Sequence, residues 1–130
     1  MDGNMAVLDA FSLYTDSCKK LYIMVRDKSI TFSKTTVDIL GRPAYVHMYF
    51  DKAGKQVAFQ ACEKDAAAIP FYKEPKEGRP VFVRMTDKKK AELLMEIANE
   101  RANAAGNKYY GKYYDSEKVV IVHLDHKIVE

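Results

Sequence analysis

The chain has 130 residues, 48% of them hydrophobic and 30% charged, a balance that predicts a folded globular domain and excludes a disordered one. No apolar run approaches about 18 residues, so we expect no transmembrane helix. Acidic residues stand where a secretory signal would carry a basic patch, and we expect a soluble cytoplasmic protein. Cys18 and Cys62 lack the spacing of metal ligands, so we expect reduced thiols and neither a disulfide framework nor a metal.

The net charge of +3 is unevenly distributed along the chain. Residues 19–42 hold six basic and two acidic residues, and residues 73–90 hold seven basic and three acidic residues, while the remainder is acidic. A solvated face would explain such runs, and so would a surface for a polyanion. We call these two segments the basic islands.

The first half of the chain predicts two hairpins around a short helix. Residues 21–27 and 29–33 alternate as a β-hairpin, and residues 35–40 follow as a helix with Ser33 or Thr35 as its cap. Gly41 suits the left-handed conformation that ends a helix, and Pro43 prevents its continuation. Residues 44–50 and 56–62 form a second hairpin, in which Gly54 suits a positive φ.

The second half predicts the same kinds of element in the same order. Residues 69–73 suit an edge strand because Pro70 cannot donate to a central ladder, and residues 80–86 form a further strand. Thr86 or Asp87 caps a helix that we expect to reach about residue 103, with Gly106 just beyond its end. Residues 107–114 and 118–125 form the last hairpin.

The order strand, strand, helix, strand, strand therefore occurs twice, over residues 21–62 and 69–125. We expect an α+β fold: a β-rich single domain over residues 1–130, in which two ββαββ halves follow an N-terminal extension of residues 1–20. Both basic islands fall in equivalent places, at the first strand pair and the helix start of each half.

The stretch V-R-D-K-S-I-T-F-S-K-T-T-V-D-I-L-G, followed by Y-V-H-M-Y-F-D-K-A-G-K-Q-V-A-F-Q, resembles the swapped-hairpin pattern of the AbrB and MazE family. Its I-x-F-x-K-x-x-V-x-x-L-G core is also similar to small uncharacterised proteins of phages and Gram-positive bacteria. In the AbrB family two chains exchange hairpins to complete one barrel that presents basic loops to DNA. The resemblance implies that this single chain builds a pseudo-duplicated, swapped-hairpin-like barrel.

Residues for catalysis are sparse in the sequence. His47 and His123 lie in alternating strands, where a structural histidine is the ordinary interpretation, and His123 with His126 lacks a third metal ligand. No glycine-rich phosphate loop and no carboxylate pair stands out. We expect no enzyme, no cofactor and no metal.

Tyrosines cluster with lysines near the end of the chain. Tyr109, Tyr110, Tyr113 and Tyr114 surround Lys108 and Lys112, a mixture that could stack bases while the lysines meet phosphates. Tyrosine is also a good strand former with a polar tip, so an ordinary sheet face or a protein interface explains the same residues.

Two functions follow as hypotheses. The first is a DNA-binding regulator whose basic side chains neutralise phosphates; its candidate residues are Arg26, Lys28, Lys34, Arg42, Arg79, Arg84, Lys88, Lys89 and Lys90. The second is a protein–protein interaction module, such as a phage or mobile-element accessory factor, with the four tyrosines at the interface. Exposed edge strands could also pair two copies into a homodimer.

Overall fold

The computed structural model describes residues 21–128, apart from the side chain of His126. The elements that it contains are β1 (Tyr22–Val25), β2 (Ile30–Phe32), α2 (Lys34–Ile39), β3 (Tyr45–Asp51), β4 (Gln56–Cys62), β5 (Ile69–Pro70), β6 (Val83–Met85), α3 (Lys88–Ala98), β7 (Asn107–Tyr114) and β8 (Val119–Lys127). The predicted element order and the α+β class are confirmed. The N-terminal extension and Cys18 lie outside the described residues.

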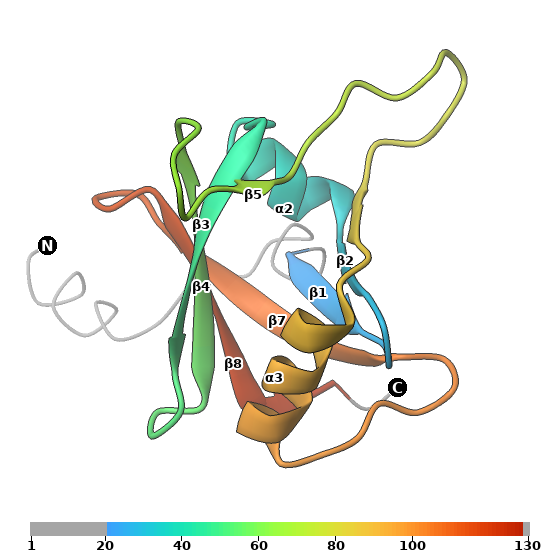
Figure 1. Cartoon of the computed structure of the whole chain (residues 1–130), viewed down its shortest axis with the longest axis vertical. Helices are drawn as coiled ribbons and strands as arrows, with labels where there is room; N and C mark the ends of the chain where they lie inside the picture. Colours follow the sequence, from blue (N-terminus) through green and yellow to red (C-terminus); the bar gives the residue numbers. More distant parts are fainter. Residues whose placement is uncertain (1–20, 129–130) are drawn as a thin grey trace, which may run out of the picture.

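The strands form one eight-stranded antiparallel sheet in the order β5-β3-β4-β8-β7-β1-β2-β6. The sheet curls into a half-barrel, with α2 near one end and α3 across the other (Figure 1). The three predicted hairpins, β1–β2, β3–β4 and β7–β8, are all present. The two remaining strands, β5 and β6, do not pair with each other, because they form the opposite edges of the sheet.

Alternation in the strands separates a core face from an outer face. In β1, Ile23 and Val25 are buried while Tyr22 and Met24 are half-buried, and β2 and β6 alternate in the same way. Because strand side chains point alternately to the two faces, residues two apart share a face. The inner face packs around fully buried Phe32, and the other face lies outside the curl.

The helices begin and end where polar side chains and positive φ angles dictate. The Ser33 side chain accepts a hydrogen bond from the backbone N–H of Thr36 at the start of α2, and Asp87 accepts one from Lys90 at the start of α3. These bonds satisfy N–H groups that have no partner within a helix. The prediction that α3 reaches about residue 103 was wrong, because Asn99 takes a left-handed conformation at φ 55° and ends the helix there.

Both four-residue hairpin loops end in a lysine of positive φ. Residues 52–55 join Asp51 to Gln56, and residues 115–118 join Tyr114 to Val119. Lys55 and Lys118 each have φ 53°. The expectation that Gly54 would supply the positive φ was wrong; its N–H donates instead to Asp51 Oδ1 at 3.0 Å.

Candidate nucleic-acid interface

The pairing of β2 with β6 brings part of the two basic islands together. Thr31 of β2 lies opposite Arg84 of β6, and Arg26 donates from Nη1 to Thr31 Oγ1 at 3.5 Å. Arg84 is exposed, and its guanidinium lies 5.7 Å from the centroid of the Phe82 ring. One cation from each island therefore occupies the same stretch of the outer face.

Aromatic rings continue this surface across β1 and β7. Tyr22 lies directly opposite Tyr110, and Met24 lies opposite Lys108. Lys108 Nζ lies 4.7 Å from the centroid of the Tyr22 ring, within the range of a cation–π contact. We define the basic–aromatic face by six outward side chains: Tyr22, Arg26, Phe82, Arg84, Lys108 and Tyr110.

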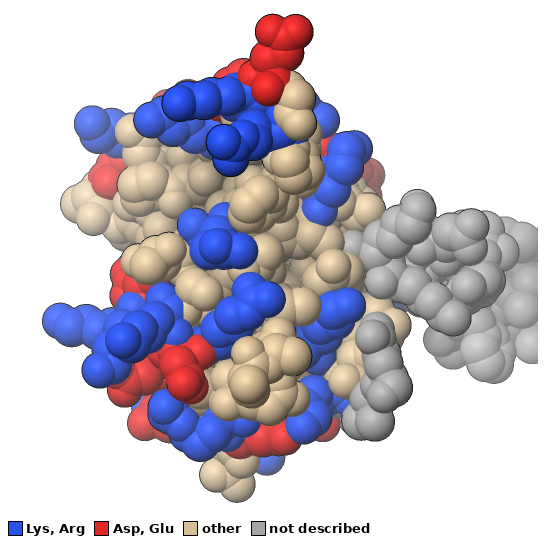
Figure 2. Space-filling model, turned by 90° about the vertical axis from the view of Figure 1, so that its right-hand side faces the viewer, with Lys and Arg blue, Asp and Glu red and all other residues tan. Residues whose placement is uncertain are grey.

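Figure 2 looks onto the side of the molecule that carries β2 and β6. Lys and Arg side chains are spread over it from top to bottom, and Asp and Glu lie in smaller groups at the upper tip, along the left and right edges, and at the lower left and bottom. Between these charges lies uncharged surface. A polyanion that approached this side would therefore meet a field of mostly positive sign.

The cap of α2 fixes the backbone of Tyr22. The carbonyl oxygen of Tyr22 accepts hydrogen bonds from the Ser33 N–H at 3.1 Å and from the Thr36 hydroxyl at 3.2 Å. Thr36 is fully buried, so these bonds are shielded from water. The abrupt change from strand to helix at residue 33 thus fixes the backbone from which Tyr22 projects onto the basic–aromatic face.

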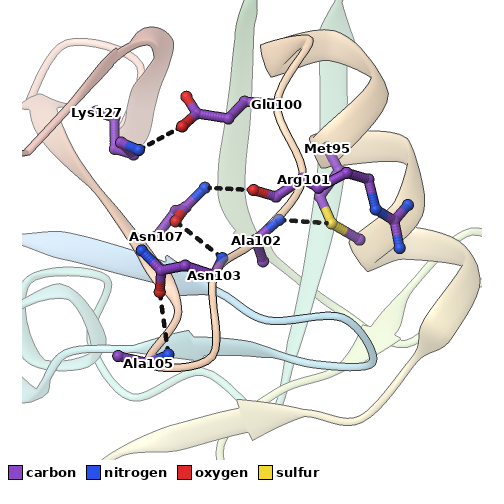
Figure 3. Close-up of polar contacts among 8 residues, drawn as sticks. All are labelled: Met95, Glu100, Arg101, Ala102, Asn103, Ala105, Asn107 and Lys127. Carbon is purple, nitrogen blue, oxygen red and sulfur yellow. Dashed lines mark hydrogen bonds and ion pairs between the residues drawn. The ribbon is translucent and has the colours of Figure 1, made fainter.

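The segment between α3 and β7 is held by polar contacts of Asn107 (Figure 3). The side chain of buried Asn107 donates to the carbonyl oxygen of Arg101 at 3.1 Å and accepts from the Asn103 N–H at 3.3 Å. The guanidinium of Arg101 lies 3.5 Å from Asp27 in the β1–β2 turn. Asp27 lies between Arg26 and Lys28 in the sequence, and the positive charge of Arg101 balances its negative charge.

Several other predicted cations lie at one end of the β2–β6 pair. Lys28 lies before β2, and the exposed Lys88 and Lys89 lie just after β6, so these three share one end. Lys90 pairs with the cap residue Asp87, and hydrogen bonds from its ammonium and its N–H lower the pKa of Asp87. Lys28, Lys88 and Lys89 therefore extend the positive surface, and Lys90 serves mainly the helix cap.

Two predicted cations, Lys34 and Arg42, are engaged by a carboxylate. Asp38 accepts from Lys34 at 2.6 Å and from Arg42 at 2.8 Å, and these bonds lower the pKa of Asp38. Arg42 also lies 5.7 Å from the centroid of the Tyr72 ring. Neither residue belongs to the basic–aromatic face, and neither does Arg79, which lies in the connection between β5 and β6.

The four clustered tyrosines do not share one surface. Tyr109 is only 2% exposed and lies in the core, where burial raises its pKa, so its prediction as an interface residue was wrong. Tyr113 is half-buried and packs against the core from the inner face. Tyr110 and Tyr114 point outward, because neighbours along a strand alternate between its faces.

Two further reactive side chains, His47 and Cys62, lie on β3 and β4. His47 Nε2 lies 2.8 Å from Asp65 Oδ2, and both groups are near the surface. Burial and the charge of Asp65 raise the pKa of Cys62, which disfavours a nucleophilic thiolate. Among the described residues, no three histidine, cysteine or acidic side chains lie together as a metal site, and no helix is long and apolar enough to cross a bilayer.

Comparison with known proteins returned no relatives. No protein-family model matches the chain, and neither the curated proteins nor the solved structures include a match. The candidate site therefore rests on the geometry of the chain alone.

Proposed function

We propose that the protein binds nucleic acid through the basic–aromatic face, in the role of a non-enzymatic DNA-binding regulator. One observation carries this function: the β2–β6 pairing places Arg84 beside Thr31 and Arg26, on the same outer surface as Tyr22 and Lys108. Basic side chains on a fixed surface neutralise phosphates and release counterions, which supplies the affinity. The aromatic rings give that surface a second kind of contact, with the faces of bases.

We also infer that the two ββαββ halves form a pseudo-duplicated, swapped-hairpin-like barrel. Equivalent strands of the two halves pair with each other twice, as β2 with β6 and β4 with β8. The pairing of β1 with β7 has its counterpart in β5 with β3, and the β3–β4 hairpin has its counterpart in β7–β8. The counterpart of β1–β2 would be β5–β6, whose strands stay apart at the sheet edges.

This interleaving supports the resemblance to the AbrB and MazE family. In both arrangements, hairpins of one half lie between hairpins of the other, and here one chain supplies both halves. The basic–aromatic face is not repeated in the other half of this arrangement. The positions on β3 that correspond to Lys108 and Tyr110 on β7 are occupied by Tyr45 and His47. A cytoplasmic location fits the free thiol of Cys62.

The double variant Arg26→Ala/Arg84→Ala tests the proposed function. We expect it to weaken binding to a fluorescein-labelled oligonucleotide about tenfold or more at 50 mM salt, measured by fluorescence anisotropy. The logarithm of the association constant falls linearly with the logarithm of the salt concentration. Each lost phosphate contact should make this line less steep by about 0.7 for a single strand and about 0.9 for a duplex. Arg84 is exposed and Arg26 half-exposed, so the variant should fold normally.

The matched control removes two cations away from this face. Lys52→Ala/Lys64→Ala deletes the same charge from exposed positions in the β3–β4 loop and after β4. It should bind nearly as well as the unmodified protein and keep most of its salt slope. Equal losses in the two double variants would reveal only a general charge effect, and no binding at 50 mM salt would contradict the proposed function.

A protein–protein module is the second candidate, and a different surface favours it. Tyr49 and Phe50, at the end of β3, are 50% and 54% exposed. They border a hollow of about 150 Å³ together with Ile121 and their strand neighbours. Exposed aromatic rings beside a hollow are typical of protein interfaces.

Capture from nuclease-treated lysate distinguishes the two candidates. For a protein module, we expect a partner that stays bound after nuclease treatment and is lost with Tyr49→Ala/Phe50→Ala. A partner that nuclease releases, and that the same variant retains, would instead support nucleic-acid binding.

A further inference from the structure

We propose that the basic–aromatic face selects single-stranded nucleic acid, with bases stacked on Tyr22 and Tyr110 and phosphates held by Arg26, Arg84 and Lys108. This inference rests on the proposed function and adds to it the form of the nucleic acid. It follows from where the rings lie, how they are held and what surrounds them.

The two rings form a pair on the surface. Tyr22 and Tyr110 lie directly opposite each other on β1 and β7, and such neighbours have Cβ atoms about 5 Å apart. Tyr110 is 40% exposed although it lies in the middle of a strand, so its ring is accessible. Adjacent rings on a sheet offer a platform on which successive bases can stack whatever their sequence.

Three cations lie on the same face as the two rings, where they can contact the phosphates of a strand stacked there. Lys108 Nζ is 4.7 Å from the centroid of the Tyr22 ring. Arg26, two residues from Met24 on the same strand face, reaches Thr31, and Arg84 lies one strand further on. The face extends over four neighbouring strands, β7, β1, β2 and β6. Neighbouring strands lie about 4.8 Å apart, so the face is about 14 Å wide, which suits a segment of about four nucleotides.

Two sets of close contacts position the backbone beneath the platform. Gly106, at φ 94°, lets the chain turn into β7 where a Cβ atom would lie 2.7 Å from Met24 Cγ. This close approach sets β7 against β1 beside Lys108. On the opposite side of β1, the Tyr22 carbonyl is held by the cap of α2.

The same geometry disfavours a duplex. Reading a duplex needs an element that enters a groove, usually a helix or a two-stranded ribbon. Here Tyr22 and Tyr110 lie on the outer face of the sheet. The cations on and just after the short helix α2, Lys34 and Arg42, are paired with Asp38. Because base faces are hidden inside a duplex, Tyr22 and Tyr110 could contribute to binding only when the bases are unpaired.

The test compares labelled dT12, rU12 and a 20-base-pair duplex by fluorescence anisotropy at 50 mM salt. We expect a single strand, DNA or RNA, to bind at least tenfold more tightly than the duplex. Tyr22→Ala/Tyr110→Ala should weaken single-strand binding about tenfold or more for each ring and leave the salt slope unchanged. Tyr22→Phe/Tyr110→Phe keeps both rings and should stay within about threefold.

Intrinsic fluorescence gives a second readout. The chain has nine tyrosines and no tryptophan, so its emission is that of tyrosine. Unlabelled dT12 should quench this emission in the unmodified protein and quench it less in the alanine variant. If the double alanine variant fails to fold by circular dichroism, Tyr110→Ala alone replaces it, because that side chain is partly exposed.

The outcomes separate this inference from the proposed function. Equal or tighter binding of the duplex would overturn the single-strand preference, and unchanged binding by the folded tyrosine variant would overturn the stacking. If Arg26→Ala/Arg84→Ala still weakens binding in that case, the proposed function survives without the inference. Absence of binding to all three probes would contradict both.

Discussion

Replacing Phe32 with alanine is expected to lower the free energy of unfolding by about 3–5 kcal/mol. Phe32 is fully buried, and its ring packs edge-to-face against two other rings. The centroid of the Phe32 ring lies 4.8 Å from that of Phe59 and 4.9 Å from that of Phe71. These rings come from β2, from β4 and from the segment just after β5, which lie far apart in the order of the sheet. The substitution therefore opens a cavity where distant strands of the curled sheet pack against each other.

Urea unfolding followed by circular dichroism measures this change. Phe32→Leu should cost less than about 1.5 kcal/mol because it keeps most of the volume. Phe50→Ala is the matched exposed control, since that ring is 54% exposed and should change stability by no more than about 0.5 kcal/mol. A loss below about 1 kcal/mol for Phe32→Ala would mean that the three rings do not form the centre of the core.

Local signals in the sequence were enough to predict the elements. Alternation in residues 21–27, the cap at Ser33 and the left-handed Gly41, observed at φ 88°, each depend on neighbours only a few residues away. Asp87 and the edge position of Pro70 follow from the same kind of short-range chemistry.

The order of the strands could not be predicted in this way. Alternation shows which residues share a face, but it is compatible with many arrangements of eight strands. The pairs β1–β7, β4–β8 and β2–β6 join segments from different halves of the chain. Only these pairs place Arg84 near Arg26 and Tyr22 beside Tyr110, so the candidate site required the structure.

One part of the site was nevertheless readable from the sequence and was missed. The face that residues 21–27 share with Arg26 also contains Tyr22, which was not chosen as a candidate. The same alternation separates Tyr109 and Tyr113, on the inner face, from Tyr110 and Tyr114, on the outer face. Treating the four tyrosines as one cluster overlooked the period of two that a strand imposes.

Cutting the chain between Gly78 and Arg79 is expected to leave a folded complex of two fragments, neither of which folds alone. The cut lies in the long connection between β5 and β6, where both residues are exposed and the chain extends away from the sheet (Figure 1). Fragment 1–78 would carry β1 to β5, and fragment 79–130 would carry β6 to β8. A site for a sequence-specific protease inserted between Gly78 and Arg79, followed by cleavage and size-exclusion chromatography, measures whether the pieces stay together.

The expected dependence of each fragment on the other follows from the interleaved sheet. Without the second fragment, β1 loses β7, β2 loses β6 and β4 loses β8, so the first fragment keeps the β1–β2 hairpin and a separate group of β3, β4 and β5. The second fragment keeps only β7–β8 as a pair, and isolated two-stranded hairpins are at best marginally stable in water. Mixing the separated fragments should restore the circular dichroism spectrum and the cooperative unfolding of the intact chain. Cooperative unfolding of either fragment alone would show that the halves are independent, because a sheet that interleaves their strands cannot survive the removal of one half.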